Sequence, residues 1–524
     1  MKATIKDTVA MTKLLSSAVL NRLITDAEPD EYFDTSEYSE ISDDAAEQLV
    51  SLTLQTDPRH QDETYSHGSS RDETQDERRI LDLDGLTSLS DGAAQHFGNF
   101  DGSIYLNGLT ELSDTAIASL CENASELSLN SLNSLSHSTA QQLAQFRGFN
   151  LYLDGLTSIS PAAAEALFSL QPCNQSFELS LNGIQELDEE VAYKLRNFNG
   201  NSLSLDGLEI LTTEVAESLS LIKPPRGHLD VSLNGLKSIS GEASAYISRI
   251  TGDLSLNGLD SISFAVAECL GKFRGMNLWL DGVQELSPDA AANLSRIEGA
   301  DLFGSHVFLG LFLNGLTHLP DESAANLAKV NSGLWLNGLQ EISDTVAEHL
   351  SQTTEELWLT GLKHLSDQAA ASLSKKPLEL HLDGLEGLST KAAEHFSNFE
   401  GVLYLNGLKR ISSSALRALS DTRADLALDG LTSLSAADAQ SLSQHRGNWL
   451  SLNGITKLQA EAADYLSLHQ GEILSLYGVN NVSFMAAATM LRYRGNVLVI
   501  NLENIPDDAS KILRKQLGII HLAS

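Results

Sequence analysis

Aromatic residues recur along the chain in a slot that suits molecular recognition. In "LWLNGL" (334–339) a tryptophan stands between two leucines, and six successive copies of this pattern carry a ring in that slot. The six rings are Trp279, Phe312, Trp335, Trp358, His381 and Tyr404. An apolar stripe of this size on a protein surface usually marks an interaction site, so we predict that these residues bind a partner. The alternative is that the rings only stack on one another as neighbours across adjacent strands.

Acidic residues occupy the two positions that flank the pattern. The columns one residue before the first leucine and one residue after the second contain carboxylates but no Lys or Arg. These acids are Glu126, Glu178, Asp230, Asp253, Glu356, Glu379 and Asp425 before the pattern, and Asp84, Asp154, Asp206, Asp281, Asp383 and Asp429 after it. Carboxylates around an apolar centre favour a partner with a basic surface, and Glu356 and Glu379 border Trp358 and His381. The alternative is a solvated acidic face.

The sequence lacks the motifs of the common catalytic sites. It contains no G-x-S-x-G, no P-loop, no H-E-x-x-H and no C-x-x-C pair, and the Gly-rich calcium-binding nonapeptide is also missing. We therefore predict a non-catalytic scaffold for a protein or peptide, with no metal and no cofactor. Two alternatives stay open: glycan binding, in which the rings stack on sugars, and a structural role in which the stripe meets a second copy of the chain as a homo-oligomer.

A repeat with one strand and one helix must position these side chains. Units aligned on the Asn or Asp before Gly follow one another mostly at 23 or 24 residues. In "LYLNGLKRISSSALRAL" (403–419), Leu403 and Leu405 alternate as in a strand, while Ile411, Ala415 and Leu419 follow at helical spacing. Neighbours on a strand point to opposite faces, so the slot between the leucines points away from the core.

Small and polar residues recur at fixed places in each unit. Gly follows the Asn or Asp in nearly all units, which predicts a turn with positive φ. Ser opens many of the helices and Asp often comes next, which suits N-capping and the helix dipole. Such serines are Ser90, Ser113, Ser343, Ser366 and Ser412. Paired alanines, such as Ala369 and Ala370, predict close packing of the helix on the strands.

These features resemble the leucine-rich-repeat superfamily. The carriers are the "LxL" strand signature, the apolar positions five and eight residues after the first Leu (Leu339 and Ile342 after Leu334) and the repeat length. The resemblance spans about residues 80–510 and implies a right-handed α/β solenoid with a parallel sheet on its concave face and helices on its convex face. The Asn or Asp comes directly after the second strand leucine, unlike the usual family spacing, and it forms either an interior ladder or only a turn. The short helical return is similar to 23-residue repeats of some bacterial surface proteins, so the chain is identified as an atypical bacterial member.

The ends of the chain depart from the repeat. We predict an N-terminal capping helix in 1–32, a degenerate first repeat with a flexible acidic insertion in 33–79, a solenoid of about 18 units in 80–510 and a C-terminal cap in 511–524. Three longer units, through 168–178, 220–230 and 296–310, insert residues at the same place, after the helix and before the next strand.

Composition narrows the class of partner. The chain has 70 acidic and 34 basic residues, for a formal charge of -36, which disfavours nucleic acid and anionic membranes. No apolar run approaches the ~20 residues of a membrane span, and no signal-peptide pattern is recognisable. The cysteines Cys121, Cys173 and Cys269 lie far apart and are interpreted as small buried hydrophobes. We therefore expect a cytoplasmic location.

Overall fold

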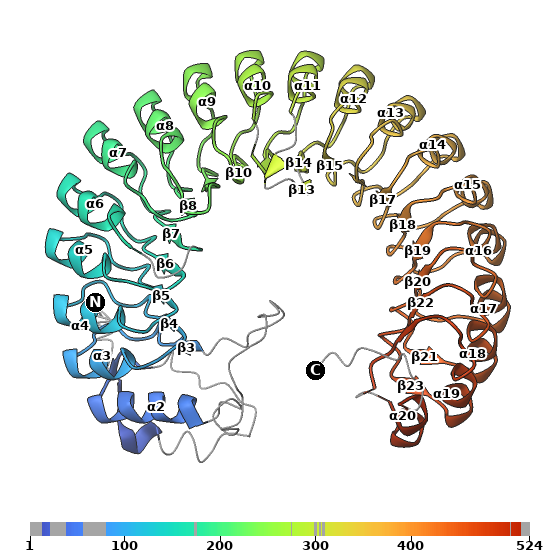
Figure 1. Cartoon of the computed structure of the whole chain (residues 1–524), viewed down its shortest axis with the longest axis horizontal. Coiled ribbons are helices and arrows are strands. Elements are labelled where there is room, and N and C mark those ends of the chain that lie inside the picture. The colour runs from blue at the N-terminus through green and yellow to red at the C-terminus, as the bar shows by residue number, and fades with distance from the viewer. Residues whose placement is uncertain are drawn as a thin grey trace, which may run out of the picture. The chain divides into compact units, whose positions relative to one another are not determined.

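The computed structural model contains two compact units, residues 1–255 and 256–524. It describes residues 13–20, 38–55, 80–171, 176–273, 275–297, 301–302, 305–306, 310–502 and 505–514. Within each unit a short strand and a short helix alternate along the chain, and the strands lie on the inner side with the helices outside them (Figure 1).

Unit 1 contains a parallel sheet backed by helices. Its strands are β3 (Ile80–Asp82), β4 (Ser103–Tyr105), β5 (Glu126–Ser128), β6 (Asn150–Tyr152), β7 (Glu178–Ser180), β8 (Ser202–Ser204), β9 (Asp230–Ser232) and β10 (Leu254–Ser255). The helices are α2 (Asp43–Gln55), α3 (Asp91–Phe97), α4 (Asp114–Leu120), α5 (His137–Leu143), α6 (Pro161–Phe168), α7 (Glu189–Leu195), α8 (Thr213–Ser220) and α9 (Gly241–Ile247). Each strand pairs in parallel with the strand of the next repeat.

Unit 2 repeats the same arrangement. Its main strands are β11 (Asn277–Trp279), β14 (Gly310–Phe312), β15 (Gly333–Trp335), β16 (Leu357–Trp358), β17 (Glu379–His381), β18 (Val402–Tyr404), β19 (Asp425–Ala427), β20 (Trp449–Ser451), β22 (Ile473–Ser475) and β24 (Val497–Val499). The helices are α10 (Phe264–Leu270), α11 (Pro288–Leu294), α12 (Asp321–Leu327), α13 (Asp344–Leu350), α14 (Asp367–Leu373), α15 (Thr390–Phe396), α16 (Ser413–Ser420), α17 (Ala436–Leu442), α18 (Ala460–Leu466), α19 (Phe484–Met490) and α20 (Asp507–Leu513). A second small parallel pair joins β21 (Lys457–Leu458) to β23 (Asn481–Val482).

Leucines in register build the core between the strands and the helices. Leu334 of β15 pairs with Leu357 of β16, which pairs with Leu380 of β17, and all three are fully buried. On the helix side the alanine pairs are buried as well, for example Ala369 and Ala370. Because one repeat cannot cover its own leucines, the apolar contacts form between successive repeats. The predicted α/β solenoid with parallel strands is confirmed.

Serine caps connect several helices to the preceding repeat. The Ser343 hydroxyl accepts a hydrogen bond from the Val346 amide at 3.0 Å and donates one to Asp321 Oδ1 at 3.0 Å. Ser366 caps α14 in the same way and donates to Asp344. Helices this short are marginal in isolation, so capping and packing have to stabilise them. The predicted caps at Ser90, Ser113, Ser343, Ser366 and Ser412 are confirmed.

The glycines after Asn or Asp have a different cause from the one expected. Within the described ranges Gly227 is the one glycine with positive φ, so the predicted positive-φ turn is wrong. A Cβ on Gly338 would instead collide with the main-chain oxygen of Asn314 in the preceding repeat, and one on Gly235 with that of Asp206. Glycine is therefore required because successive turns stack backbone against backbone.

The Asn and Asp side chains form a ladder along the sheet edge. The backbone N–H of Asn337 donates to Asn314 Oδ1 at 3.1 Å, and the backbone N–H of Thr360 donates to Asn337 Oδ1 at 3.0 Å. The same bond joins Asp206 to Asn182 and Asn453 to Asp429. The ladder is thus confirmed over the turn-only alternative. Its residues are partly exposed, so it lies at the edge of the strands and not in the interior.

The N-terminal segment differs from the predicted capping helix. Leu14–Leu15 forms strand β1, which pairs in parallel with β2 (Glu40–Ile41), and only residues 17–20 of the described part are helical. Leu15 aligns with Ile41, and Leu20 then donates to the Ser16 carbonyl as Ala46 does to that of Ser42. An extended Leu15 can pair with Ile41 and bury its side chain. Residues 13–20 therefore begin another decayed repeat, while 1–12 and 21–37 lie outside the described residues.

The other end segments are described only in part. Helix α2 keeps the buried Ala45 and Ala46 of the degenerate repeat. The expected loop at 56–79 and most of the C-terminal cap at 511–524 lie outside the described residues. The insertions follow α6, α8 and α11, and the third contains an antiparallel pair, β12 (Asp301–Leu302) with β13 (Ser305–His306). Among the described residues no helix has the length and apolar character to span a bilayer.

Candidate binding surface

Unit 2 places the six predicted rings on successive strands in one continuous row, which we name the aromatic stack. The pairwise centroid distances, in chain order, are 5.0 Å for Trp279 and Phe312, 4.1 Å for Phe312 and Trp335, 5.7 Å for Trp335 and Trp358, 3.4 Å for Trp358 and His381, and 4.0 Å for His381 and Tyr404. The interplanar angles fall from 21° at the first pair to 7° at the last. Parallel strands lie ~4.8 Å apart, so the sheet itself sets the stacking distance.

The rings are less exposed than the sequence suggested. Trp335 is 9% exposed and His381 4%, while the other members are partly exposed. Each inner ring has neighbours against both faces, which leaves its edges as the accessible part. The stacking alternative is therefore correct as a description of the ring contacts. The surface open to a partner consists of ring edges and the carboxylates beside them.

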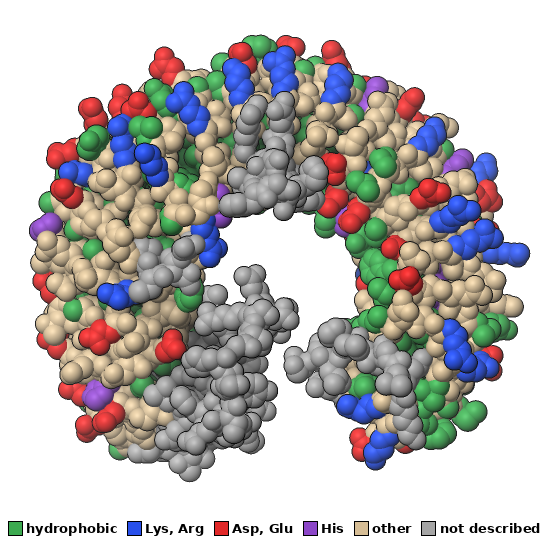
Figure 2. All heavy atoms as spheres, viewed as in Figure 1, with side chains coloured by type: hydrophobic (Ala, Val, Ile, Leu, Met, Phe, Trp, Pro, Cys, Tyr) green, Lys and Arg blue, Asp and Glu red, His purple; other side chains and the backbone are tan. Residues whose placement is uncertain are grey.

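Carboxylates border the stack on both sides. We name Glu356, Glu379, Asp383 and Asp425 the carboxylate rim. The indole nitrogen of Trp358 donates to Glu356 Oε2 at 3.2 Å, and His381 Nε2 lies 3.4 Å from Glu379 Oε2. Burial raises the pKa of Glu356; the Trp358 hydrogen bond lowers it and the charge of Glu379 raises it. Figure 2 shows carboxylates beside hydrophobic side chains along the inner side of unit 2.

A buried lysine supplies a positive charge that the sequence columns did not reveal. Lys376 is 3% exposed and its Nζ donates to the carbonyls of Glu355 and Pro377. Burial lowers the pKa of Lys376 to about 8, against the opposing effect of Glu355, Glu356 and Glu379. Lys376 lies outside the flanking columns, at a position where several other repeats have Phe or Val. The negative charge of the rim is thus partly compensated by a lysine from outside those columns.

The fourth tryptophan also reaches this surface. Trp449 stands in the column before the first leucine, and its ring meets Tyr404 at 5.9 Å and 63°. The intervening slot residue is Ala427, which is small enough to leave that contact open. Trp449 was not predicted as a site residue because it belongs to a different column from the stack. The available signal was that Trp449 is the one aromatic residue in a column that otherwise holds polar, acidic, aliphatic and glycine residues.

Carboxylates near Tyr404 affect its hydroxyl. Burial raises the pKa of Tyr404, and the charges of Glu379, Glu356, Asp383 and Asp425 raise it further. The negative potential of the rim therefore extends to the last ring of the stack.

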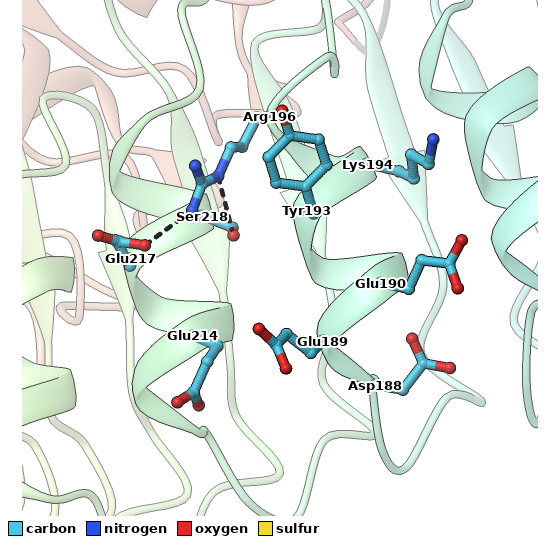
Figure 3. A pocket seen from close by; sticks show the side chains of 9 residues that line it. All are labelled: Asp188, Glu189, Glu190, Tyr193, Lys194, Arg196, Glu214, Glu217 and Ser218. Atoms are coloured by element: carbon cyan, nitrogen blue, oxygen red, sulfur yellow. Dashed lines mark hydrogen bonds and ion pairs between the residues drawn. The ribbon is translucent and has the colours of Figure 1, made fainter.

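A groove on the outer side of unit 1 is the main alternative site. It lies between α7 and α8, has a volume of about 730 Å³ and is lined mostly by charged residues (Figure 3). Arg196 pairs with Glu217 at 2.7 Å and with the Ser218 hydroxyl at 3.2 Å. These are exposed pairs between neighbouring helices, which contribute little to binding or stability. Among the described residues no cluster of His, Cys, Asp and Glu could hold a metal ion.

Comparisons with known proteins place the fold in context. No protein-family model and no curated protein matches the sequence. Solved structures that resemble the chain include Toll in the Toll–Spatzle complex of Drosophila, at 15% identity and a TM-score of 0.40, covering 74% of this chain and 55% of that one. A TLR13–ssRNA13 complex matches at 16% identity and a TM-score of 0.40, covering 81% and 62%. The chain thus spans under two thirds of either protein, and this level of likeness says nothing of what it binds.

Proposed function

We propose that the inner face of β11 and β14–β18 is a non-catalytic binding surface for another protein or peptide. The observation that carries the proposal is the continuous aromatic stack bordered on both sides by the carboxylate rim. Ring edges offer apolar contact, while carboxylates select against acidic partners and favour basic ones. The predicted anchors Trp279, Phe312, Trp335, Trp358 and Tyr404 therefore belong to one surface, with the partner segment running across the strands.

The ring geometry favours a peptide over a sugar. Glycans stack on the face of an aromatic ring, but the faces of Phe312, Trp335, Trp358 and His381 are covered by neighbouring rings. The same cover removes the cation–π contact expected at these inner rings, because a cation has to lie over a ring face. Positive groups of the partner would contact the rim instead. Partner side chains then alternate between apolar contact with ring edges and ionic contact with carboxylates.

Nucleic acid is a poor ligand for the same surface. Phosphates of a nucleic acid would lie near Glu356, Glu379 and Asp383, which repel them. Nucleic-acid binding is driven by cationic side chains that displace counterions from the phosphates, and carboxylates cannot do this. The RNA of the TLR13–ssRNA13 complex belongs to that protein. Single-stranded RNA is nevertheless a useful probe here, because measurable binding to it would contradict the proposal.

Selection of peptides tests the proposal directly. A displayed random-peptide library is selected on the full chain, and the enriched peptides are measured against wild type and against Trp335→Ser with Trp358→Ser. We expect enrichment of peptides that combine Lys or Arg with apolar residues, and loss of their binding by more than about tenfold in the double variant, because central anchors dominate interface energy. The matched control is Phe264→Ala, which removes a ring that is 59% exposed on α10.

Two results would overturn the proposal. One is equal binding of the selected peptides to wild type and to a folded double variant. The other concerns self-assembly: light scattering would find a dimer in wild type that dissociates in the double variant. The aromatic stack would then serve contact between copies of the chain.

A further inference from the structure

His381 occupies an unusual place within the aromatic stack. Its ring lies nearly parallel to Trp358 at 8° and to Tyr404 at 7°, with centroid distances of 3.4 and 4.0 Å. The two ring nitrogens therefore point sideways, toward the rim: Nε2 is 3.4 Å from Glu379 Oε2, and Nδ1 is 3.7 Å from Asp383 Oδ2. A histidine between two aromatic faces and two carboxylates is a site built for positive charge.

The Nε2 atom of His381 is buried without a hydrogen-bond partner. Its side chain is 5% exposed, and no acceptor or donor in the described residues satisfies that nitrogen. Such an atom is costly, and most buried polar atoms in proteins are paired. When Nε2 carries no proton, it and Glu379 Oε2 are both acceptors, so the pair lacks a donor between them. Either a proton on the imidazole or an N–H from a ligand can supply that donor.

Several other charged groups lie around this pair. Glu356 precedes β16 and receives the indole N–H of Trp358 on one oxygen. Asp383 follows β17, and Asp425 begins β19 beyond Tyr404. Lys376 and Glu355 lie behind, where the lysine ammonium is held by two carbonyls. Glu356, Glu379 and Asp383 thus place negative charge near His381, and the nearby lysine is already engaged.

We propose that His381 Nε2, Glu379 and Glu356 together bind a lysine or arginine side chain of the partner, and that a proton on His381 competes with it. This inference rests on the proposed function of the same surface. The ligand N–H donates to the neutral imidazole and to the carboxylates, with charge-assisted bonds to the latter. An imidazolium pairs with Glu379 itself and repels the incoming cation. Protonation of His381 should therefore weaken binding of the cation.

The first test uses defined peptides as probes. A fluorescent lysine-rich peptide, its Nε-acetyllysine counterpart and single-stranded RNA are titrated into the full chain. We expect the lysine peptide to bind and Glu356→Gln with Glu379→Gln to weaken it about tenfold, as for desolvated charge pairs at interfaces. The acetylated peptide should bind the wild type as weakly as the lysine peptide binds this variant.

A matched control separates this site from the general acidity of the chain. Glu189→Gln with Glu214→Gln removes two carboxylates from the outer groove of Figure 3 and should leave the affinity within a factor of about two. Equal losses in the two double variants would overturn the inference. Melting curves of both variants establish that each is folded.

The second test isolates the proton. His381→Phe preserves a flat ring between Trp358 and Tyr404 but has no nitrogen. For the wild type we expect affinity for the lysine peptide to fall about tenfold on acidification, and for His381→Phe to show a clearly smaller fall. The remaining dependence reports on the carboxylates. Equal pH dependence in the two proteins would overturn the competition by His381.

Failure of this inference can be told from failure of the proposed function. If Trp335→Ser with Trp358→Ser abolishes binding of library-selected peptides while the Glu356 and Glu379 variant binds them normally, the surface stands and the cation site falls. If neither variant affects those peptides, both fall.

Discussion

The same strand slot has opposite chemistry in the two units. In unit 1 it holds mainly serine, and each hydroxyl donates to the Asn or Asp ladder of the preceding repeat, as Ser232 does to Asp206 at 2.6 Å and Ser204 to Asn182 at 2.7 Å. In unit 2 it holds the aromatic stack, whose rings contact one another. Ser451 and Ser475 near the end of unit 2 return to the serine pattern.

This difference separates what stabilises the repeat from what is available to a ligand. A serine hydroxyl that binds the ladder closes a polar network within the chain, so its donor is already used. In the aromatic stack the rings contact one another instead, and Asp383 lies 3.7 Å from the His381 ring rather than accepting from a serine hydroxyl. One backbone thus carries an inner face satisfied by itself in unit 1 and one that offers edges and charge in unit 2.

The largest expected effect concerns the scaffold that both faces share. Gly235→Ala in unit 1 and Gly338→Ala in unit 2 should each lower the free energy of unfolding by about 2–4 kcal/mol, because the new Cβ meets the backbone of the preceding repeat. Urea denaturation followed by circular dichroism measures this. Gly387→Ala is the control, since a Cβ added there would have no other atom within 4 Å. A cost in only one unit would mean that the two scaffolds differ.

The next effect concerns the buried ring that follows the helix, at equivalent positions of the two units. After the helices unit 1 buries Phe100, Phe146 and Phe198, whereas two of the corresponding positions late in unit 2 hold His445 and His469, whose rings lie 5.5 Å apart. Burial, together with a smaller effect of the charge of His445, lowers the pKa of His469 to about 4.

The neutral ring is therefore favoured in the folded state. Stability should be constant above about pH 6.5, fall by about 3 kcal/mol as the pH drops to about 4, and level off below that. His469→Phe should reduce this slope, as measured by urea denaturation at several pH values. Identical slopes in the two proteins would contradict the burial of a neutral imidazole. This response belongs to folding, so it provides the lower pH limit for binding studies on His381.

Most of the fold could be predicted from the sequence because the pattern of each strand and each helix recurs in many repeats. The "LxL" pattern located strands such as β15, and the Ser-Asp pairs located the starts of helices such as α13. The expected glycine turn was wrong because sequence reports the residue type and not its neighbour: nothing local reveals that Asn314 of the preceding repeat lies against Gly338. The N-terminal apolar residues fitted a helix equally well until Leu15 was seen to pair with Ile41.

The candidate surface was only partly predictable for a related reason. Alternation along a strand predicts that Trp335 and His381 point to the same side, but not how fully adjacent rings cover each other. Lys376 and Trp449 were missed because they reach the surface from other columns. The assignment of site residues and the bacterial origin stay predictions.

A smaller effect follows from the number of ladder bonds. Asp206 accepts three hydrogen bonds: from the Ser232 hydroxyl, from the backbone N–H of Asn234 and from the side chain of Asn234. Asp281 accepts one, from the backbone N–H of Asn314. Asp206→Ala should therefore cost about 2–3 kcal/mol and Asp281→Ala about 1 kcal/mol in unfolding free energy. Asp206→Asn keeps an acceptor and should cost less than Asp206→Ala. Equal costs of the two alanine variants would mean that the serine network adds nothing to the ladder.

The smallest expected stability effect comes from replacing a ring of the aromatic stack by the serine that is typical of this slot in unit 1. Trp335→Ser loses ring contacts with Phe312 and Trp358, worth about 0.5–1.5 kcal/mol each, but places a hydroxyl where Ser128 elsewhere donates to Asn107 at 2.7 Å. The new hydrogen bond to Asn314 offsets about 1 kcal/mol, so the net loss in unfolding free energy should be about 0–2 kcal/mol. Trp335→Val fills part of the space without a donor and should be less stable than Trp335→Ser if the ladder accepts that bond. If the valine variant is the more stable one, packing rather than the polar network determines the stability of this slot. Serine and aromatic residues would then differ in what they offer a ligand and not in how they stabilise the repeat.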